Sequence, residues 1–202
     1  MRKISAPISF VPEVARYLEV PLLLIHNITY PLMPFFQQAP PALTKLGRYR
    51  VLSPNAGVRV SPLQLGAMNV GDKWSANMGT MDKESSFKLL DAFYEAGVSV
   101  AFDSDFVITD SVFLQGNFID TANNYQDETS EMFIGEWAEQ RGIRDQLVIA
   151  TKYSANYKRG SNTIPIKMNY AGNSHKTLHI SVEASLKKLR TAYIDILYVH
   201  CK

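Results

Sequence analysis

Short apolar runs alternate with amphipathic stretches from residue 47 onward, and this order limits the possible folds more than any other feature of the chain. Four runs rich in Val, Ile, Leu and Ala are typical of buried strands: Leu63 to Ala67, Asn117 to Ala122, Leu147 to Thr151 and Ile194 to Val199. Three stretches with apolar residues at helical spacing lie between them: Lys83 to Ala96, Ser130 to Arg141 and Lys176 to Arg190. This order predicts an α/β fold with a parallel sheet covered by helices, built either as a doubly wound sheet or as a (β/α)-barrel.

Local signals mark the ends of these elements. Asp82 can cap the first helix and Gly97 can stop it. Turn residues between Tyr49 to Leu52 and Gly57 to Val60 predict a small hairpin ahead of the first buried strand. In the third helix, the side chains expected to face the core are Leu178, Val182, Ser185, Leu186 and Leu189.

The amino-terminal region differs in composition from the rest. No residue from Val20 to Thr44 is charged, but prolines such as Pro31 and Pro34 would remove helix hydrogen bonds that lipid cannot replace. Pro7 and Pro12 also interrupt the place where a secretory signal needs an apolar core. We therefore expect residues 1–45 to be a loosely ordered extension and residues 46–202 to form the folded part.

The charge balance and the cysteine content exclude several classes of protein. Lys and Arg total 21 against 19 Asp and Glu, a formal net charge of +2, which gives no electrostatic footprint for nucleic acid or an anionic membrane. A small molecule is the expected partner. Cys201 is the single cysteine, so an internal disulfide and a cysteine-based zinc site are excluded, and a reducing, cytoplasmic setting is expected.

Polar side chains stand where three of the predicted strands end. Asp120 ends the second strand, Tyr125 lies in the loop behind it, Lys152 follows the third strand, and His200 follows the fourth. Because ligands bind beyond the carboxyl ends of parallel strands in both candidate folds, we expect these four side chains to converge on one rim.

The four residue types make a chemically sensible set. A tyrosine has a pKa of about 10 and donates a proton reluctantly at neutral pH, whereas a nearby ammonium group favours loss of that proton. Lys152 can supply the ammonium to Tyr125, Asp120 can hold Lys152 charged and oriented, and His200 can position a carbonyl oxygen. No side chain donates a hydride, so a reduction needs an external cofactor such as a nicotinamide.

Three other patterns have simpler explanations. Tyr198 and Lys202 have the Y-x-x-x-K spacing of short-chain dehydrogenases, but the pair begins inside a strand and no G-x-G-x-x-G follows any strand. Asp72 stands where a phosphate-binding loop needs lysine. His175 and His179 share a helix face without an apparent third ligand, so no metal site is expected.

Several motifs in the right order resemble those of the aldo-keto reductases. They are Asn117 to Tyr125 (NFIDTANNY), Ile149 to Lys152 (IATK) and Asp195 to His200 (DILYVH). Leu46 to Ser53 and Gly57 to Met68 are similar to the fungal aryl-alcohol dehydrogenase branch, which includes norsolorinic acid reductase-like proteins.

The resemblance implies a (β/α)8 TIM barrel that uses NADP(H) without a metal to interconvert an aromatic or polyketide aldehyde or ketone and its alcohol. It implies that Tyr125 donates the proton with Lys152 and Asp120 in support, and that His200 binds substrate. Asp120 would also contact the nicotinamide ribose, and the loop around Met68 would lie near the cofactor.

Two departures from the family pattern stand out. Residues 98–115 form an insertion, which is either an intron translated in frame or a loop at the amino-terminal face of the barrel. The chain stops at Lys202, so we expect the first half of a barrel, truncated after its fourth strand. The alternative function is therefore a catalytically inactive half-barrel or interaction remnant that lacks most of the cofactor site, with possible self-association through open sheet edges.

Overall fold

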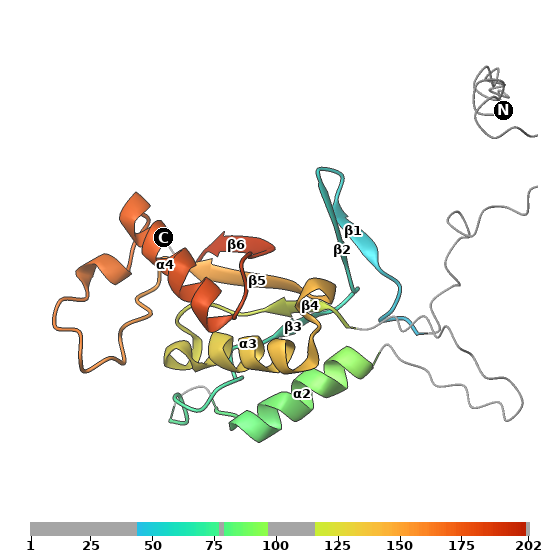
Figure 1. Cartoon of the computed structure of the whole chain (residues 1–202), viewed down its shortest axis with the longest axis horizontal. Coiled ribbons are helices and arrows are strands. Elements are labelled where there is room, and N and C mark those ends of the chain that lie inside the picture. The colour runs from blue at the N-terminus through green and yellow to red at the C-terminus, as the bar shows by residue number, and fades with distance from the viewer. Residues whose placement is uncertain (1–43, 77–78, 97–115, 201–202) are drawn as a thin grey trace, which may run out of the picture. The chain divides into compact units, whose positions relative to one another are not determined.

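The computed structural model describes residues 44–76, 79–96 and 116–200, and its centre is a parallel sheet (Figure 1). The sheet has the order β3-β4-β5-β6, and every neighbouring pair is parallel. Its strands are β3 (Gln64–Gly66), β4 (Phe118–Asp120), β5 (Val148–Tyr153) and β6 (Ile196–Val199). The prediction of an α/β fold with a parallel sheet is confirmed.

A separate antiparallel hairpin precedes the sheet, as predicted. It consists of β1 (Arg50–Ser53) and β2 (Ala56–Val60), which pair through Arg50 with Val60 and through Ser53 with Ala56.

The strands differ by one or two residues from their predicted bounds, and the end of β5 matters most for the position of Lys152. The predicted third strand ended at Thr151, but β5 continues to Tyr153, which pairs with Val199 of β6. Pairing with β6 keeps the backbone extended, so Lys152 lies inside β5 and opposite Tyr198 rather than after the strand.

Among the described residues, three helices lie between the strands of the sheet in the chain order. They are α2 (Lys83–Glu95), α3 (Thr129–Arg141) and α4 (His175–Lys188), with short 3-10 turns η3 (Tyr125–Glu128), η4 (Arg144–Gln146) and η5 (Met168–Tyr170). Asp82 caps α2 as predicted, since its Oδ1 accepts a hydrogen bond of 2.8 Å from the backbone N–H of Ser85. Gly97 lies outside the described residues.

The core lies between the sheet and two helices that run side by side, α2 and α3 (Figure 1). Leu90 of α2 and Trp137 of α3 are fully buried in it together with Ile119 of β4 and Ile149 of β5. Leu90 and Trp137 both belong to the stretches in which the sequence places apolar residues at helical spacing, so these two stretches form helices with a buried face, as predicted.

The prediction for α4 is confirmed only in part: Ser185 is buried, and so is Leu189 directly after the helix. Thr177, Ser181 and Ser185 are buried, whereas Leu178 and Val182 are only partly buried. The end of α4 lies very close to α3: a Cβ added at Gly135 of α3 would lie 2.2 Å from the carbonyl oxygen of Lys188. Only glycine therefore fits at this position of α3.

Other expectations concern the surface and the termini. Leu197, Tyr198 and Val199 of β6 are exposed at one edge of the described sheet, and self-association through that edge stays a prediction. The expected extension lies almost wholly, and the insertion wholly, outside the described residues. In the part of the chain that the structure describes, every helix is too short or too polar to cross a membrane.

Candidate active site

The structure brings four polar side chains together at the carboxyl end of the sheet. Asp120 is the last residue of β4, Lys152 lies near the end of β5, and His200 follows β6. Tyr125 begins the turn η3 behind β4. Because β4, β5 and β6 are parallel neighbours, these positions share one edge of the sheet.

Lys152 is the centre of the group. Its Nζ donates hydrogen bonds to Oδ2 of Asp120 at 2.7 Å and to the carbonyl oxygen of Thr121 at 2.8 Å. The same Nζ lies 4.8 Å from the ring centroid of Tyr125. Only 14% of the Lys152 side chain is exposed, against 24% of Asp120, so the ammonium is largely removed from water but remains paired.

Two further rings surround the phenol of Tyr125. The His200 ring stands edge-on to it, with centroids 5.5 Å apart and an interplanar angle of 80°. Trp74, from the loop between β3 and α2, is also edge-on, at 6.2 Å and 74°. Sequence reasoning did not single out Trp74, because its approach to Tyr125 depends on how two distant loops pack.

His200 is held through its backbone and has a lowered pKa. Its N–H donates to the carbonyl oxygen of Tyr153 at 2.8 Å and to Oγ of Ser154 at 3.2 Å. Burial of the ring lowers the pKa of His200, the nearby Lys152 ammonium lowers it further, and Asp120 partly offsets both effects. The Nδ1 atom is buried without a hydrogen-bond partner in the described structure.

We expect His200 to be neutral at pH 7 and to take up a proton only below the ordinary histidine pKa of about 6.5. Because the folded pKa is lowered, the contribution of His200 to stability is complete above the unfolded pKa and is lost as pH falls through the folded one. An NMR titration of the histidine rings, assigned with His200→Gln, measures this. A pKa of the His200 ring at or above the ordinary histidine value would refute this prediction.

The arrangement combines three capabilities in one place. A paired ammonium group lies against a phenol that can donate a proton, and a neutral imidazole stands beside that phenol. Such a set can bind a carbonyl oxygen by hydrogen bonds and protonate it as negative charge develops.

A buried ion pair supports the loop that carries Tyr125, and sequence reasoning missed it. Glu131 of α3 is fully buried, and its Oε2 lies 2.8 Å from Nζ of Lys188 at the end of α4. Thr151 of β5 donates to Oε1 of Glu131 at 2.6 Å. Lys188 also donates to the carbonyl oxygen of Asn123 at 2.9 Å. The pair therefore links α3, α4 and β5 to the segment just before Tyr125.

The described contacts connect Met68 to this group only indirectly. Met68 lies in the loop after β3, its side chain is exposed, and its carbonyl oxygen accepts a hydrogen bond of 3.1 Å from Nε2 of Gln126. Gln126 is the neighbour of Tyr125 in the chain. The loop of Met68 and the turn of Tyr125 are thus joined, although the Met68 side chain touches none of the four residues in any described contact.

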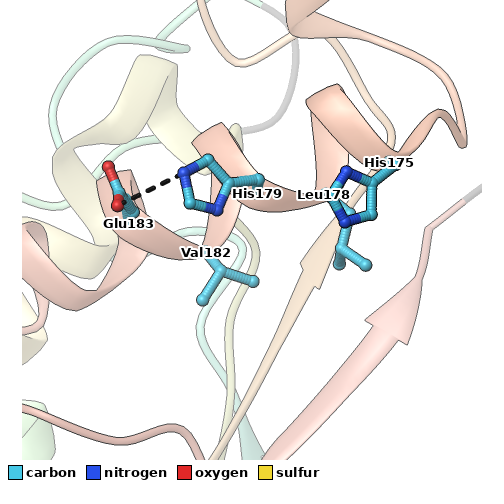
Figure 2. Close-up of a pocket in the computed structure, with 5 residues that line it drawn as sticks. All are labelled: His175, Leu178, His179, Val182 and Glu183. Atoms are coloured by element: carbon cyan, nitrogen blue, oxygen red, sulfur yellow. Dashed lines mark ion pairs between the residues drawn. The ribbon is translucent and has the colours of Figure 1, made fainter.

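A hollow of about 250 Å³ lies along α4, and none of the four polar residues lines it (Figure 2). Leu178 and Val182 line it together with His175, His179 and Glu183. The Nε2 atom of His179 lies 3.5 Å from Oε1 of Glu183. Among the described residues, no group of three or more His, Cys, Asp or Glu side chains could hold a metal ion.

Comparisons with known proteins give a consistent result. The Aldo/keto reductase family model matches residues 62–202. An aryl-alcohol dehydrogenase [NADP(+)] of Phanerodontia chrysosporium is 60% identical over 171 residues, which cover 83% of this chain and 40% of that protein. A norsolorinic acid reductase of Emericella nidulans is 53% identical over 161 residues, which cover 80% of this chain and 36% of that protein.

Solved structures agree on the fold. The crystal structure of a Pseudomonas aeruginosa protein assigned as an aldo-keto reductase matches with a TM-score of 0.52 and 26% identity. The match covers 79% of this chain and 49% of that one. The chain thus spans about two fifths of the length of the two fungal relatives and about half of the bacterial structure.

Proposed function

The chain belongs to the aldo/keto reductase family, and from this premise we propose that it is an NADP-dependent reductase of aromatic or polyketide aldehydes and ketones that also oxidises the corresponding alcohols. The observation that carries the proposal is the position of Lys152, which contacts the Asp120 carboxylate and the Tyr125 ring at once. Similarity to an aryl-alcohol dehydrogenase and to a norsolorinic acid reductase supports the substrate class.

In the proposed reaction, Tyr125 donates its hydroxyl proton to the carbonyl oxygen of the substrate. The Lys152 ammonium next to the ring stabilises the phenolate that remains, and Asp120 keeps Lys152 charged and in place. In the reverse direction the same phenolate accepts the proton of the alcohol. After each reduction the phenolate of Tyr125 must take up a new proton, which solvent can supply.

His200 is proposed to bind the same carbonyl oxygen. Its lowered pKa keeps the ring neutral at pH 7, so one ring nitrogen carries a proton and the other a lone pair. Since Nδ1 is buried without an acceptor, the proton is better placed on Nε2. A neutral donor can hold a carbonyl oxygen without competing with Tyr125 for the protonation step.

The residues present fit a nicotinamide cofactor. NADPH, when bound, supplies the hydride, because no side chain of the chain can. About a quarter of the Asp120 side chain stays exposed beside the nearly buried Lys152, which leaves its carboxylate open to a hydroxyl group of a ligand. We propose that Asp120 contacts the nicotinamide ribose and that the loop around Met68 lies near the cofactor.

The surroundings of Tyr125 suit a flat, aromatic substrate. Trp74 and His200 each make a T-shaped contact with the ring of Tyr125, so the proton donor has two aromatic neighbours. Aromatic side chains pack well against aromatic ligands in offset and edge-on arrangements. This agrees with the substrate that the name of the Phanerodontia chrysosporium relative states.

Cofactor binding and turnover by the purified chain test the proposal. We expect NADPH to raise the melting temperature and to be oxidised, by loss of absorbance at about 340 nm, when an aromatic aldehyde is added. Asp120→Asn should weaken NADPH binding, whereas Asp145→Asn should not, because Asp145 is exposed and its described partner is the hydroxyl of Tyr193. A chain that neither binds NADPH nor oxidises it would instead support the alternative of a catalytically inactive half-barrel.

A further inference from the structure

The side chain of Gln126 is fully buried directly after Tyr125. Its Oε1 accepts hydrogen bonds from the backbone N–H groups of Lys73 at 3.0 Å and Trp74 at 2.8 Å. Its Nε2 donates to the carbonyl oxygens of Met68 at 3.1 Å and Gly79 at 3.0 Å. A side-chain amide offers two lone pairs and two N–H groups, so the hydrogen-bonding capacity of Gln126 is fully used. All of its partners belong to the segment between β3 and α2.

The backbone from Gln126 to Glu128 is strained, and the side chains of these three residues hold it in place. Gln126, Asp127 and Glu128 have φ angles of 52°, 46° and 85°, a left-handed run that residues other than glycine rarely adopt. Oδ1 of Asp127 accepts from Nε1 of Trp74 at 3.0 Å, and Oε1 of Glu128 accepts from Nζ of Lys158 at 2.6 Å. Each residue of the left-handed run is therefore anchored by its own side chain.

The two segments approach each other closely at Gly71. A Cβ added there would lie 2.5 Å from Cβ of Gln126, and the φ of Gly71 is +131°, so the position requires glycine. The contact between the segments is thus tight as well as hydrogen-bonded.

From these contacts we propose that Gln126 is a positioning residue that sets the spacing between Trp74 and the proton donor Tyr125. One end of the Gln126 residue is bonded to Tyr125, and its amide oxygen holds the backbone N–H of Trp74. Displacement of the Trp74 backbone away from the turn that carries Tyr125 would break the hydrogen bonds of this amide, and it would also lengthen the ring contact at 6.2 Å. The inference rests on the proposed function, because it assigns Tyr125 the role of proton donor.

Gln126→Glu tests the proposal with little change in shape. The carboxylate keeps one oxygen for the N–H groups of Lys73 and Trp74, but it presents its second oxygen to the carbonyl oxygens of Met68 and Gly79. The negatively charged oxygen then faces two carbonyl oxygens, and none of the three can donate a hydrogen bond. The loop of Met68 and Gly79 should therefore separate from the turn that carries Tyr125. Gln64→Glu is the matched control, because Gln64 is exposed in β3.

The first measurement needs no activity. Fluorescence of Trp74 is isolated by subtracting the spectrum of the Trp74→Phe counterpart from that of each protein. We expect acrylamide to quench Trp74 more strongly in Gln126→Glu than in the parent chain or in Gln64→Glu. Gln126→Met, which has a similar length and adds no charge, should show the same direction of change and covers the case in which the charged variant does not fold.

The second measurement separates positioning from general destabilisation. We expect kcat for an aromatic aldehyde to fall about 10²-fold in Gln126→Glu, since a small displacement of a reacting group has effects of that size. Any change in the dissociation constant for NADPH should be much smaller than the fall in kcat, because Asp120 and Lys152, unlike the loop of Met68, are held by contacts that do not involve Gln126. Unchanged quenching together with unchanged kcat would overturn the proposal. If the parent chain has no activity at all, the proposed function fails, and the quenching comparison alone then decides whether Gln126 holds Trp74.

Discussion

Tyr125→Phe is expected to lower kcat for an aromatic aldehyde by about 10²- to 10⁴-fold, the usual contribution of a positioned general acid. The substitution removes the phenolic hydroxyl and keeps the ring, so the edge-on contacts with His200 and Trp74 are preserved. The ammonium of Lys152 stays paired with Asp120 as well. The loss should therefore appear in kcat, with the dissociation constant for NADPH little changed.

Tyr193→Phe is the matched control for this experiment. It also removes a phenolic hydroxyl, but the one that donates to Oδ1 of Asp145 at 2.7 Å on the exposed surface. Steady-state rates for both variants, measured beside NADPH titrations, separate loss of the proton donor from a general effect on the fold. Equal rates for Tyr125→Phe and the parent chain would mean that another group protonates the substrate.

Lys188→Met is expected to lower the free energy of unfolding by about 3–5 kcal/mol, because it leaves a buried carboxylate without its cation. That carboxylate is Glu131, which is fully buried and 2.8 Å from Nζ of Lys188. The substitution also removes the hydrogen bond from Lys188 to the carbonyl oxygen of Asn123. Urea unfolding followed by circular dichroism measures the change.

A control and a compensating variant make this second prediction specific. Lys187→Met removes an exposed positive charge from the same turn of α4 and should change stability by less than about 0.5 kcal/mol. Adding Glu131→Gln to Lys188→Met should recover part of the loss, since the buried group is then neutral and can still accept from Thr151. A Lys188→Met chain as stable as Lys187→Met would contradict a structural role for the pair.

Periodicity in the sequence predicted the elements of the fold because burial imposes it. Leu90 of α2 and Trp137 of α3 each belong to a set of apolar residues at helical spacing, and both are fully buried. The same reasoning succeeded only in part for α4: Ser185 is buried as predicted, but Ser181 is buried without having been predicted, and α4 ends close to Gly135 of α3. Periodicity records which residues are apolar, whereas the distance between two helices depends on a glycine in the partner helix.

The four polar residues could be predicted to converge because parallel strands end at one edge of a sheet. The residues that hold them could not. Gln126 and Glu131 are residue types found mostly on surfaces, and nothing in their local sequence indicates burial. Their burial depends on distant partners: Lys73 is 53 positions from Gln126. Only the packing of the loops reveals such contacts.

Transfer of deuterium tests the central claim, that this chain reduces a carbonyl group with a nicotinamide hydride at the site of Tyr125. The purified chain is incubated with an aromatic aldehyde and NADPH carrying deuterium at one or the other hydride position of carbon 4, and the alcohol is analysed by mass spectrometry. We predict that one of the two labelled cofactors gives alcohol with a single deuterium on the former carbonyl carbon, and that Tyr125→Phe forms this product far more slowly. Absence of labelled alcohol with both cofactors would contradict the account.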